Sequence, residues 1–115
     1  MSAATVEQTI RLYLDDLIIR DWKDRSVLTT GRVLRSFFRD DLAQPLASLY
    51  PDRARDIAAG LPDRIGKYTR RPLTKQTRRG YRAESRVFLA WCVRMHFIPA
   101  NPLDQSVADD SAAER

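Results

Sequence analysis

The chain has 115 residues, 43% of them hydrophobic and 30% charged, which fits one compact soluble domain and is too short for two ordinary ones. Its 20 Lys and Arg residues against 15 Asp and Glu residues give a net charge of +5, which favours an anionic partner, with nucleic acid as the first candidate. The longest apolar run, residues 87–93, has seven residues, far below the roughly 20 that a membrane span requires.

Helical spacing dominates the chain, and no useful length shows the alternation of a half-buried strand, so an all-α domain is predicted. The first helix is predicted over about residues 5–20, because Thr5 and Gln8 form a capping box ahead of a periodic apolar face. That face comprises Val6, Ile10, Tyr13, Leu14, Leu17 and Ile18.

A second helix is predicted to begin at an N-cap, Ser26, and to fade before Pro45. Gly31 lies inside it and weakens it by about 1 kcal/mol relative to Ala. The expected buried stripe consists of Val33, Leu34, Phe37, Phe38 and Leu42.

The third region is expected to form two short pieces or one kinked helix. Pro51 suits a first helical position, but residues 60–62 (Gly-Leu-Pro) interrupt the apolar pattern. That pattern consists of Ala54, Ile57, Ala58 and Leu61.

A linker over residues 68–72 leads to Thr74, the predicted N-cap of a long last helix that ends near Met95. Residues 1–103 are therefore expected to form the domain. Residues 104–115 are polar and aperiodic, which is typical of a disordered tail or of a linker to a further domain. The arc predicted to face the core from the last helix consists of Thr77, Tyr81, Ser85, Phe88, Cys92 and Met95, with Trp91 beside it.

The basic charge is concentrated in one segment. Residues 64–94 contain ten Lys or Arg residues and one acid, Glu84, for a local charge of +9, which leaves −4 for the rest of the chain. Arginine forks onto phosphate and guanine edges better than lysine does, so nucleic-acid binding is favoured over a merely solvated face. The basic arc of the last helix consists of Lys75, Arg78, Arg79, Arg82 and Arg86, with Arg70 and Arg71 in the linker before it.

The second helix adds Arg32 and Arg35, with Lys23 and Arg25 in the turn before it. These residues would flank the same groove if the N-terminal halves of the second and last helices lie side by side. Phosphate groups also bind at helix N-termini, where backbone N–H groups are unpaired.

No metal site, cofactor or small-molecule substrate is predicted. The chain has one histidine, His96, and one cysteine, Cys92, which are too few for a ligand set or an internal disulfide. Cys92 is expected to be an inert core thiol. Because residues 1–5 do not begin a signal peptide, a cytoplasmic protein is expected.

Several segments, in this order along the chain, resemble the N-terminal core-binding domain of phage-integrase-type tyrosine recombinases. Those in the second half are residues 74–77 (Thr-Lys-Gln-Thr), residues 86–91 (Arg-Val-Phe-Leu-Ala-Trp) and residues 98–103 (Ile-Pro-Ala-Asn-Pro-Leu). Residues 6–10 and the Ser26-x-x-Thr29 element continue the likeness in the first half. The resemblance implies a four-to-five-helix SAM-like orthogonal bundle that turns its second and fourth helices toward the DNA major groove.

In that family a separate C-terminal domain cleaves the strand. The resemblance thus implies a DNA-recombination or DNA-integration role in which this domain docks on duplex DNA, beside other recombinase protomers, and is nucleoid-associated when bound. Two features depart from the family: His96 stands where it usually has Gly, and the catalytic Arg, Lys, His-x-x-Arg and Tyr set is missing, so no enzymatic activity is expected. The implied DNA contacts are Thr29, Arg32, Lys75, Thr77, Arg78, Arg79 and Arg82.

Two other functions are compatible with the sequence. One is a SAM-like protein-interaction module, in which the acidic first helix of one copy meets the basic last helix of another. The other is an RNA-binding helical domain, although Tyr81, Phe88 and Trp91 suit a core better than a stacking platform.

Overall fold

The computed structural model describes residues 4–66 and 69–103 of the chain. Within these ranges the regular secondary structure is helical, and β pairing is limited to two isolated bridges, Thr5 with Pro45 and Ile65 with Pro72. The all-α prediction is therefore confirmed. No helix in the described ranges is long and apolar enough to cross a membrane. The predicted tail, residues 104–115, lies outside the described residues.

Helix α1 (Val6–Ile19) begins as predicted. The Gln8 backbone N–H donates to Thr5 Oγ1 at 3.1 Å, and the Thr5 N–H donates to Gln8 Oε1 at 2.9 Å, so both halves of the capping box are made. Its predicted apolar face is buried, except that Leu14 is only partly buried and Ile18 is 54% exposed.

Helix α2 (Asp24–Phe37) begins two residues before the predicted cap. Ser26 lies inside the helix, and Lys23 is the N-cap without a side-chain hydrogen bond. The predicted cap was wrong because α1 ends in a tight turn, with Asp21 in the left-handed region at φ 64°, so the next helix starts at once. Val33 and Leu42 are only partly buried, whereas Val27 and Thr30 are buried in the stripe instead.

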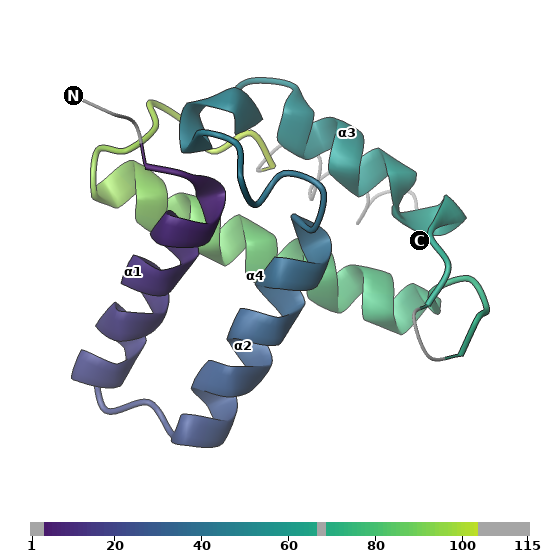
Figure 1. Cartoon of the computed structure of the whole chain (residues 1–115), viewed down its shortest axis with the longest axis horizontal. Coiled ribbons are helices and arrows are strands. Elements are labelled where there is room, and N and C mark those ends of the chain that lie inside the picture. The colour runs from purple at the N-terminus through teal and green to yellow at the C-terminus, as the bar shows by residue number, and fades with distance from the viewer. Residues whose placement is uncertain (1–3, 67–68, 104–115) are drawn as a thin grey trace, which may run out of the picture.

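Helices α1 and α2 run antiparallel beside each other (Figure 1). Gly31 permits this close approach, because a Cβ added there would lie 2.9 Å from Leu14 Cδ1. The glycine that weakens α2 as an isolated helix therefore lets it pack against α1.

The third region forms short pieces, as expected: η1 (Leu46–Leu49), α3 (Arg53–Gly60) and η2 (Leu61–Asp63). Helix α3 begins at Arg53, two residues after Pro51, so Pro51 precedes the helix and does not open it. The apolar pattern predicted for the third region is buried throughout.

Helix α4 (Lys75–Arg94) runs across the α1–α2 pair (Figure 1). Thr74 caps it as predicted, since the Thr77 N–H donates to Thr74 Oγ1 at 3.1 Å. It ends with His96 in the left-handed region at φ 64°, and the Phe97 N–H donates to the Cys92 carbonyl at 2.9 Å. The histidine therefore makes the turn that glycine usually makes at a helix end.

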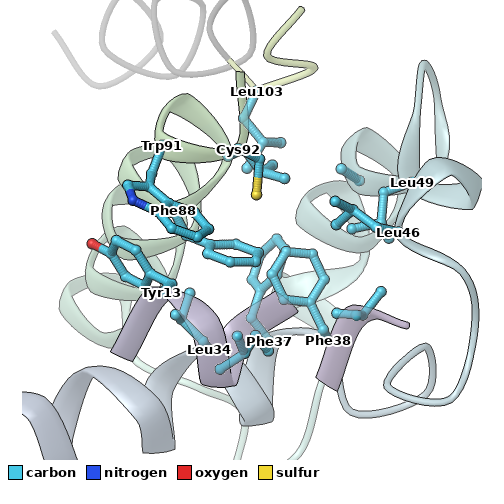
Figure 2. Packing of buried hydrophobic residues seen from close by; sticks show 14 of the residues in the cluster. Tyr13, Leu34, Phe37, Phe38, Leu46, Leu49, Phe88, Trp91, Cys92 and Leu103 are labelled. Carbon is cyan, nitrogen blue, oxygen red and sulfur yellow. The ribbon is translucent and has the colours of Figure 1, made fainter. Parts of the chain in front are cut away.

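The core is centred on the middle of α4. Phe88 contacts Tyr13 of α1, with ring centroids 5.4 Å apart, and Phe38 after α2, with centroids 5.9 Å apart (Figure 2). The predicted core arc holds for Ser85, Phe88, Trp91 and Cys92, which are buried, while Thr77 and Tyr81 are partly buried.

Met95 was placed in this arc wrongly, because it is the C-cap residue of α4 and is 48% exposed. Leu89, which the helical arc left out, is fully buried. The segment after α4 folds back along it, and the Asn101 side-chain amide donates to the Arg86 carbonyl at 2.9 Å. This return buries Ile98 and Leu103 and extends the core beyond the arc that periodicity predicts.

Candidate nucleic-acid interface

The basic residues of α4 differ in how far they reach solvent. Lys75 and Arg79 are exposed, whereas Arg78, Arg82 and Arg86 are partly buried. Five residues at these spacings do lie toward one side of the helix, but three of them border the core. The exposed part of the predicted arc is therefore concentrated in the first two turns of α4.

Two of the partly buried arginines carry an unsatisfied donor. The Nε atoms of Arg78 and Arg86 are buried and have no hydrogen-bond partner within the described part of the chain. Arg86 lies where the returning C-terminal segment is hydrogen-bonded to α4, so it is less suited than Arg79 to contact a partner. A buried guanidinium donor without a partner costs stability unless another group satisfies it.

The first turn of α4 is electropositive because of its residues and because of the helix dipole. It contains no acidic residue, and Lys75 is its first residue, at the end where backbone N–H groups are unpaired. Beside these groups, the Thr74 hydroxyl donates a hydrogen bond to the Thr77 hydroxyl, with the two oxygens 2.9 Å apart. Thr77, a predicted contact, thus lies at the N-terminus of α4 as expected.

Arg70 and Arg71 lie on the loop that precedes α4, and both are exposed. The loop is closed at its base, because the Gly66 N–H donates to the Arg71 carbonyl at 2.7 Å and the Leu73 N–H donates to the Arg64 carbonyl at 3.2 Å. Arg70 has φ 57°, a left-handed conformation that few non-glycine residues adopt. These backbone hydrogen bonds fix the base of the loop, and the two arginines lie on it a few residues before α4 begins.

The predicted contacts on α2 divide into two groups. Thr29 and Arg32 are exposed. Arg35 instead binds Glu7 of α1, with Nε 3.0 Å from Oε1 and Nη2 3.1 Å from Oε2. This bidentate ion pair links α1 to α2. Because it uses the guanidinium group of Arg35, the main role of Arg35 is structural.

The predicted side-by-side placement of the N-terminal halves of α2 and α4 is wrong. The C-terminal end of α2 meets α4, where Ser36 Oγ lies 3.1 Å from Tyr81 Oη. The start of α2, with Lys23 and Arg25, lies at the opposite end of that helix (Figure 1). The two helices cross because the aromatic residues at the end of α2 pack on the middle of α4, and this contact outweighs any pairing along their lengths.

A further arginine, Arg64, lies where α2 and α4 cross. It contributes to the charge of residues 64–94 but was not predicted as a site residue. Arg64 donates from Nη1 to the Ser36 carbonyl at 2.7 Å and from Nη2 to the Phe37 carbonyl at 3.2 Å. It thereby satisfies carbonyls at the C-terminal end of α2, where a cation is favoured. Burial, and after it the like charge of Arg39, lowers the pKa of Arg64. Only the tertiary contact between distant segments places these two arginines together.

Cys92 is buried in the core, as predicted, and burial raises the pKa of its thiol to about 12. A thiol with so high a pKa is almost entirely neutral at physiological pH and is a poor nucleophile. Nothing in its surroundings gives it a role in a binding site.

Comparisons of the chain with protein-family models, curated proteins and solved structures found no match. The likeness to tyrosine recombinases therefore rests on the sequence segments themselves, and the geometry of the arginines has to support a function independently.

Proposed function

We propose that this chain binds duplex DNA and is the core-binding domain of a tyrosine recombinase, in which it positions a separate catalytic domain during site-specific recombination or integration. The contact surface is the basic face, which we define as Arg70, Arg71, Lys75, Arg78, Arg79 and Arg82. Thr29 and Arg32 of α2 extend it. One observation carries the proposal. The basic face comes from a short stretch of the chain, the loop before α4 and the first turns of α4, so its positive charges lie together at the N-terminal end of that helix.

The chemistry of this face suits a phosphate backbone. Five of its six members are arginines, whose planar guanidinium groups bind phosphate oxygens in pairs. The exposed members stand at the N-terminus of α4, where the helix dipole adds positive potential. Contacts of this kind supply affinity and orientation rather than sequence information, so most of the binding is expected to be salt-dependent and weakly specific.

The structure gives less support to the interaction-module alternative. That alternative needs an acidic surface on α1, but Glu7 is bound to Arg35, and Asp16 Oδ2 lies 2.9 Å from Arg20 Nε. Their negative charge is largely neutralised within the chain. The third acid of α1, Asp15, is exposed and forms no ion pair within the described residues, so a second copy would find one unpaired carboxylate on this helix.

The test is a titration of the chain into random-sequence duplex DNA at several salt concentrations. We expect a Kd of about 10⁻⁴ to 10⁻⁶ M at physiological salt and a salt dependence that corresponds to roughly three to six phosphates. The informative variant is Lys75→Glu with Arg79→Glu, because both residues are exposed and a reversal of charge there leaves the core intact. We expect this variant to bind at least about tenfold more weakly than the parent chain.

The control is Arg11→Glu, which reverses one charge on α1 at a side chain that is 72% exposed. It should retain most of the affinity, and far-UV circular dichroism should show unchanged helicity for both proteins. If both variants weaken binding equally, the contact is not confined to the basic face. If the parent chain does not bind the duplex at low salt, the proposed function is wrong.

A further inference from the structure

Two recesses lie on either side of Arg39 and Arg64. The larger, of about 700 Å³, lies between α2, α4 and the loop before α4, and it is lined also by Arg32, Ser36 and Tyr81. The smaller, of about 260 Å³, lies against α3 and is lined also by Arg53. Both recesses share the same two arginines, so their remaining lining residues decide what each can hold.

The charges of the two recesses differ sharply. The smaller recess contains three arginines and three carboxylates, from Asp40, Asp56 and Asp63, and is formally neutral. The larger recess also contains three arginines, but none of the described residues that line it is a carboxylate. Arg32 and Arg64 form no ion pair within the described ranges, and Arg39 has only a 3.7 Å contact with Asp40, whose side chain is 71% exposed. Three guanidinium groups therefore border one concave space that no carboxylate of the described residues lines, and two of them, Arg39 and Arg64, also border the smaller recess.

The larger recess also contains hydrogen-bond donors that the chain does not use. Arg64 directs two of its N–H groups to backbone carbonyls, and a guanidinium has five. Ser36 and Tyr81 share one hydrogen bond at 3.1 Å, and a pair of bonded hydroxyls always retains one hydrogen that can be donated. These donors and the three guanidinium groups line the same recess.

We propose that this recess, the α2–α4 recess, is a binding site for a phosphate group, held by Arg32, Arg39 and Arg64 with a hydroxyl hydrogen from the Ser36–Tyr81 pair. Arginine recognises phosphate through paired N–H donors, and a partly enclosed space strengthens such bonds relative to open solvent. The inference goes beyond the proposed DNA face and does not require it, because free phosphate or a small phosphorylated molecule offers the same chemistry as a DNA backbone.

The electrostatics of Arg64 support this assignment. Burial lowers its pKa most, the like charge of Arg39 lowers it further, and the smaller effects of Asp40 and Tyr81 act in the opposite direction. Arginine nevertheless stays protonated at neutral pH. A bound phosphate would offset the repulsion between these two arginines, which no carboxylate in the larger recess does.

The experiment is an NMR titration of the full chain, labelled with ¹⁵N, with inorganic phosphate at constant ionic strength and with sodium chloride as the reference. We expect saturable shifts of the amide signals of Ser36, Gly66 and Tyr81, with a Kd on the order of 1 mM. Arg39→Gln and Arg32→Gln should each weaken phosphate binding by roughly three- to tenfold. Arg64 is left unchanged, because it also satisfies the carbonyls at the end of α2.

The matched control is Arg11→Gln, which removes one exposed charge from α1 and should leave the phosphate affinity unchanged. Shifts that do not saturate, or that are the same in Arg39→Gln as in the parent chain, would overturn the site. So would equal losses in all three variants, because they would indicate general charge attraction.

A second titration, with a short DNA duplex, identifies the source of the phosphate. If inorganic phosphate and the duplex compete and Arg39→Gln weakens both, the recess holds a backbone phosphate. If Arg39→Gln weakens only inorganic phosphate, the recess serves a small phosphorylated ligand. A chain that binds phosphate in the recess but does not bind the duplex refutes the proposed function alone, whereas a chain that binds the duplex without phosphate in the recess refutes only this inference.

Discussion

The α1–α2 pair and the N-terminal half of α4 use charge in opposite ways. On the first, Glu7 binds Arg35 across the two helices at 3.0 Å, and Asp16 lies 2.9 Å from Arg20. On the second, residues 64–94 hold a single acid, Glu84, and the first turn of α4 holds none. In the first region acids and bases pair with each other, whereas the second region carries positive charge almost alone, which attracts anionic groups.

Phe88, which follows the N-terminal half of α4 in the same helix, packs α4 against the α1–α2 pair, and its removal should have the largest effect on stability. Its ring contacts Tyr13 of α1 and Phe38 after α2, and the residue is fully buried. Phe88→Ala should lower the free energy of unfolding by about 3–5 kcal/mol, through lost burial and the cavity left behind. Urea denaturation measures this change. Val87→Ala, at a neighbouring position that is 47% exposed, is the control and should cost less than about 1 kcal/mol. A similar loss in both variants would show that Phe88 is not the residue that holds α4 on the α1–α2 pair.

Cys92, in the same core, gives the stability a pH dependence of known sign. Burial raises the pKa of its thiol to about 12 in the folded chain, whereas an unfolded thiol ionises near pH 8.5. The stabilisation from the neutral buried thiol is therefore complete below about pH 8.5 and is lost as the pH rises through 12. In that interval the unfolded chain gives up a proton that the folded chain keeps, which costs about 1.4 kcal/mol per pH unit.

The measurement compares the parent chain with Cys92→Ala by urea denaturation at pH 7.5 and at pH 10. The difference in the free energy of unfolding between the two proteins should shift by about 2 kcal/mol, against the parent chain at the higher pH. Other titrating groups contribute equally to both proteins and cancel. A difference that stays constant with pH would mean that the folded thiol ionises as readily as an unfolded one.

The smallest effects test the comparison of charges most directly. Glu7→Gln removes a paired charge between α1 and α2 and should lower the free energy of unfolding by about 0.5–1 kcal/mol, a modest value because both partners are partly exposed. Lys75→Gln removes a cation from the positive end of α4 and should raise the free energy of unfolding by about 0.3–0.5 kcal/mol. Thermal denaturation at low salt measures both.

Opposite signs for the two variants would establish that one region uses charge for stability and the other does not. A loss in both would contradict the distinction. Lys75→Gln should also weaken DNA binding while it stabilises the fold, a combination that misfolding cannot produce.

The local features of this fold could be predicted because their signals lie within a few residues of one another. The capping box of Thr5 and Gln8 and the cap at Thr74 act on backbone N–H groups three residues away. The bounds of α1 and α4 and most of their buried faces follow from those caps and from helical periodicity. Ser26 was misjudged because a good capping residue is not used when the preceding turn already starts the helix at Asp24.

The candidate site was predicted only in part. Lys75, Thr77 and Arg79 lie where the sequence placed them, because their positions depend on one helix. The pairing of Arg35 with Glu7, 28 residues away in the chain, could not be read from spacing within α2. The contact of Arg64 with the end of α2 could not be predicted either, because Arg64 follows α3 in the sequence and lies 28 residues after Ser36.

The sequence by itself determined that this protein is all-α, where its first and last helices begin, and that its positive charge is concentrated near α4, because propensity, capping and composition act locally. The tertiary structure alone decided that the end of α2, and not its start, meets α4, and that Glu7 of α1 pairs with Arg35. It also decided that Arg32, Arg39 and Arg64 line one recess in which no described residue contributes a carboxylate. These features depend on contacts between residues far apart in the chain, as do the contacts of Phe38 and Tyr13 with Phe88, and such contacts leave no periodic trace in the sequence.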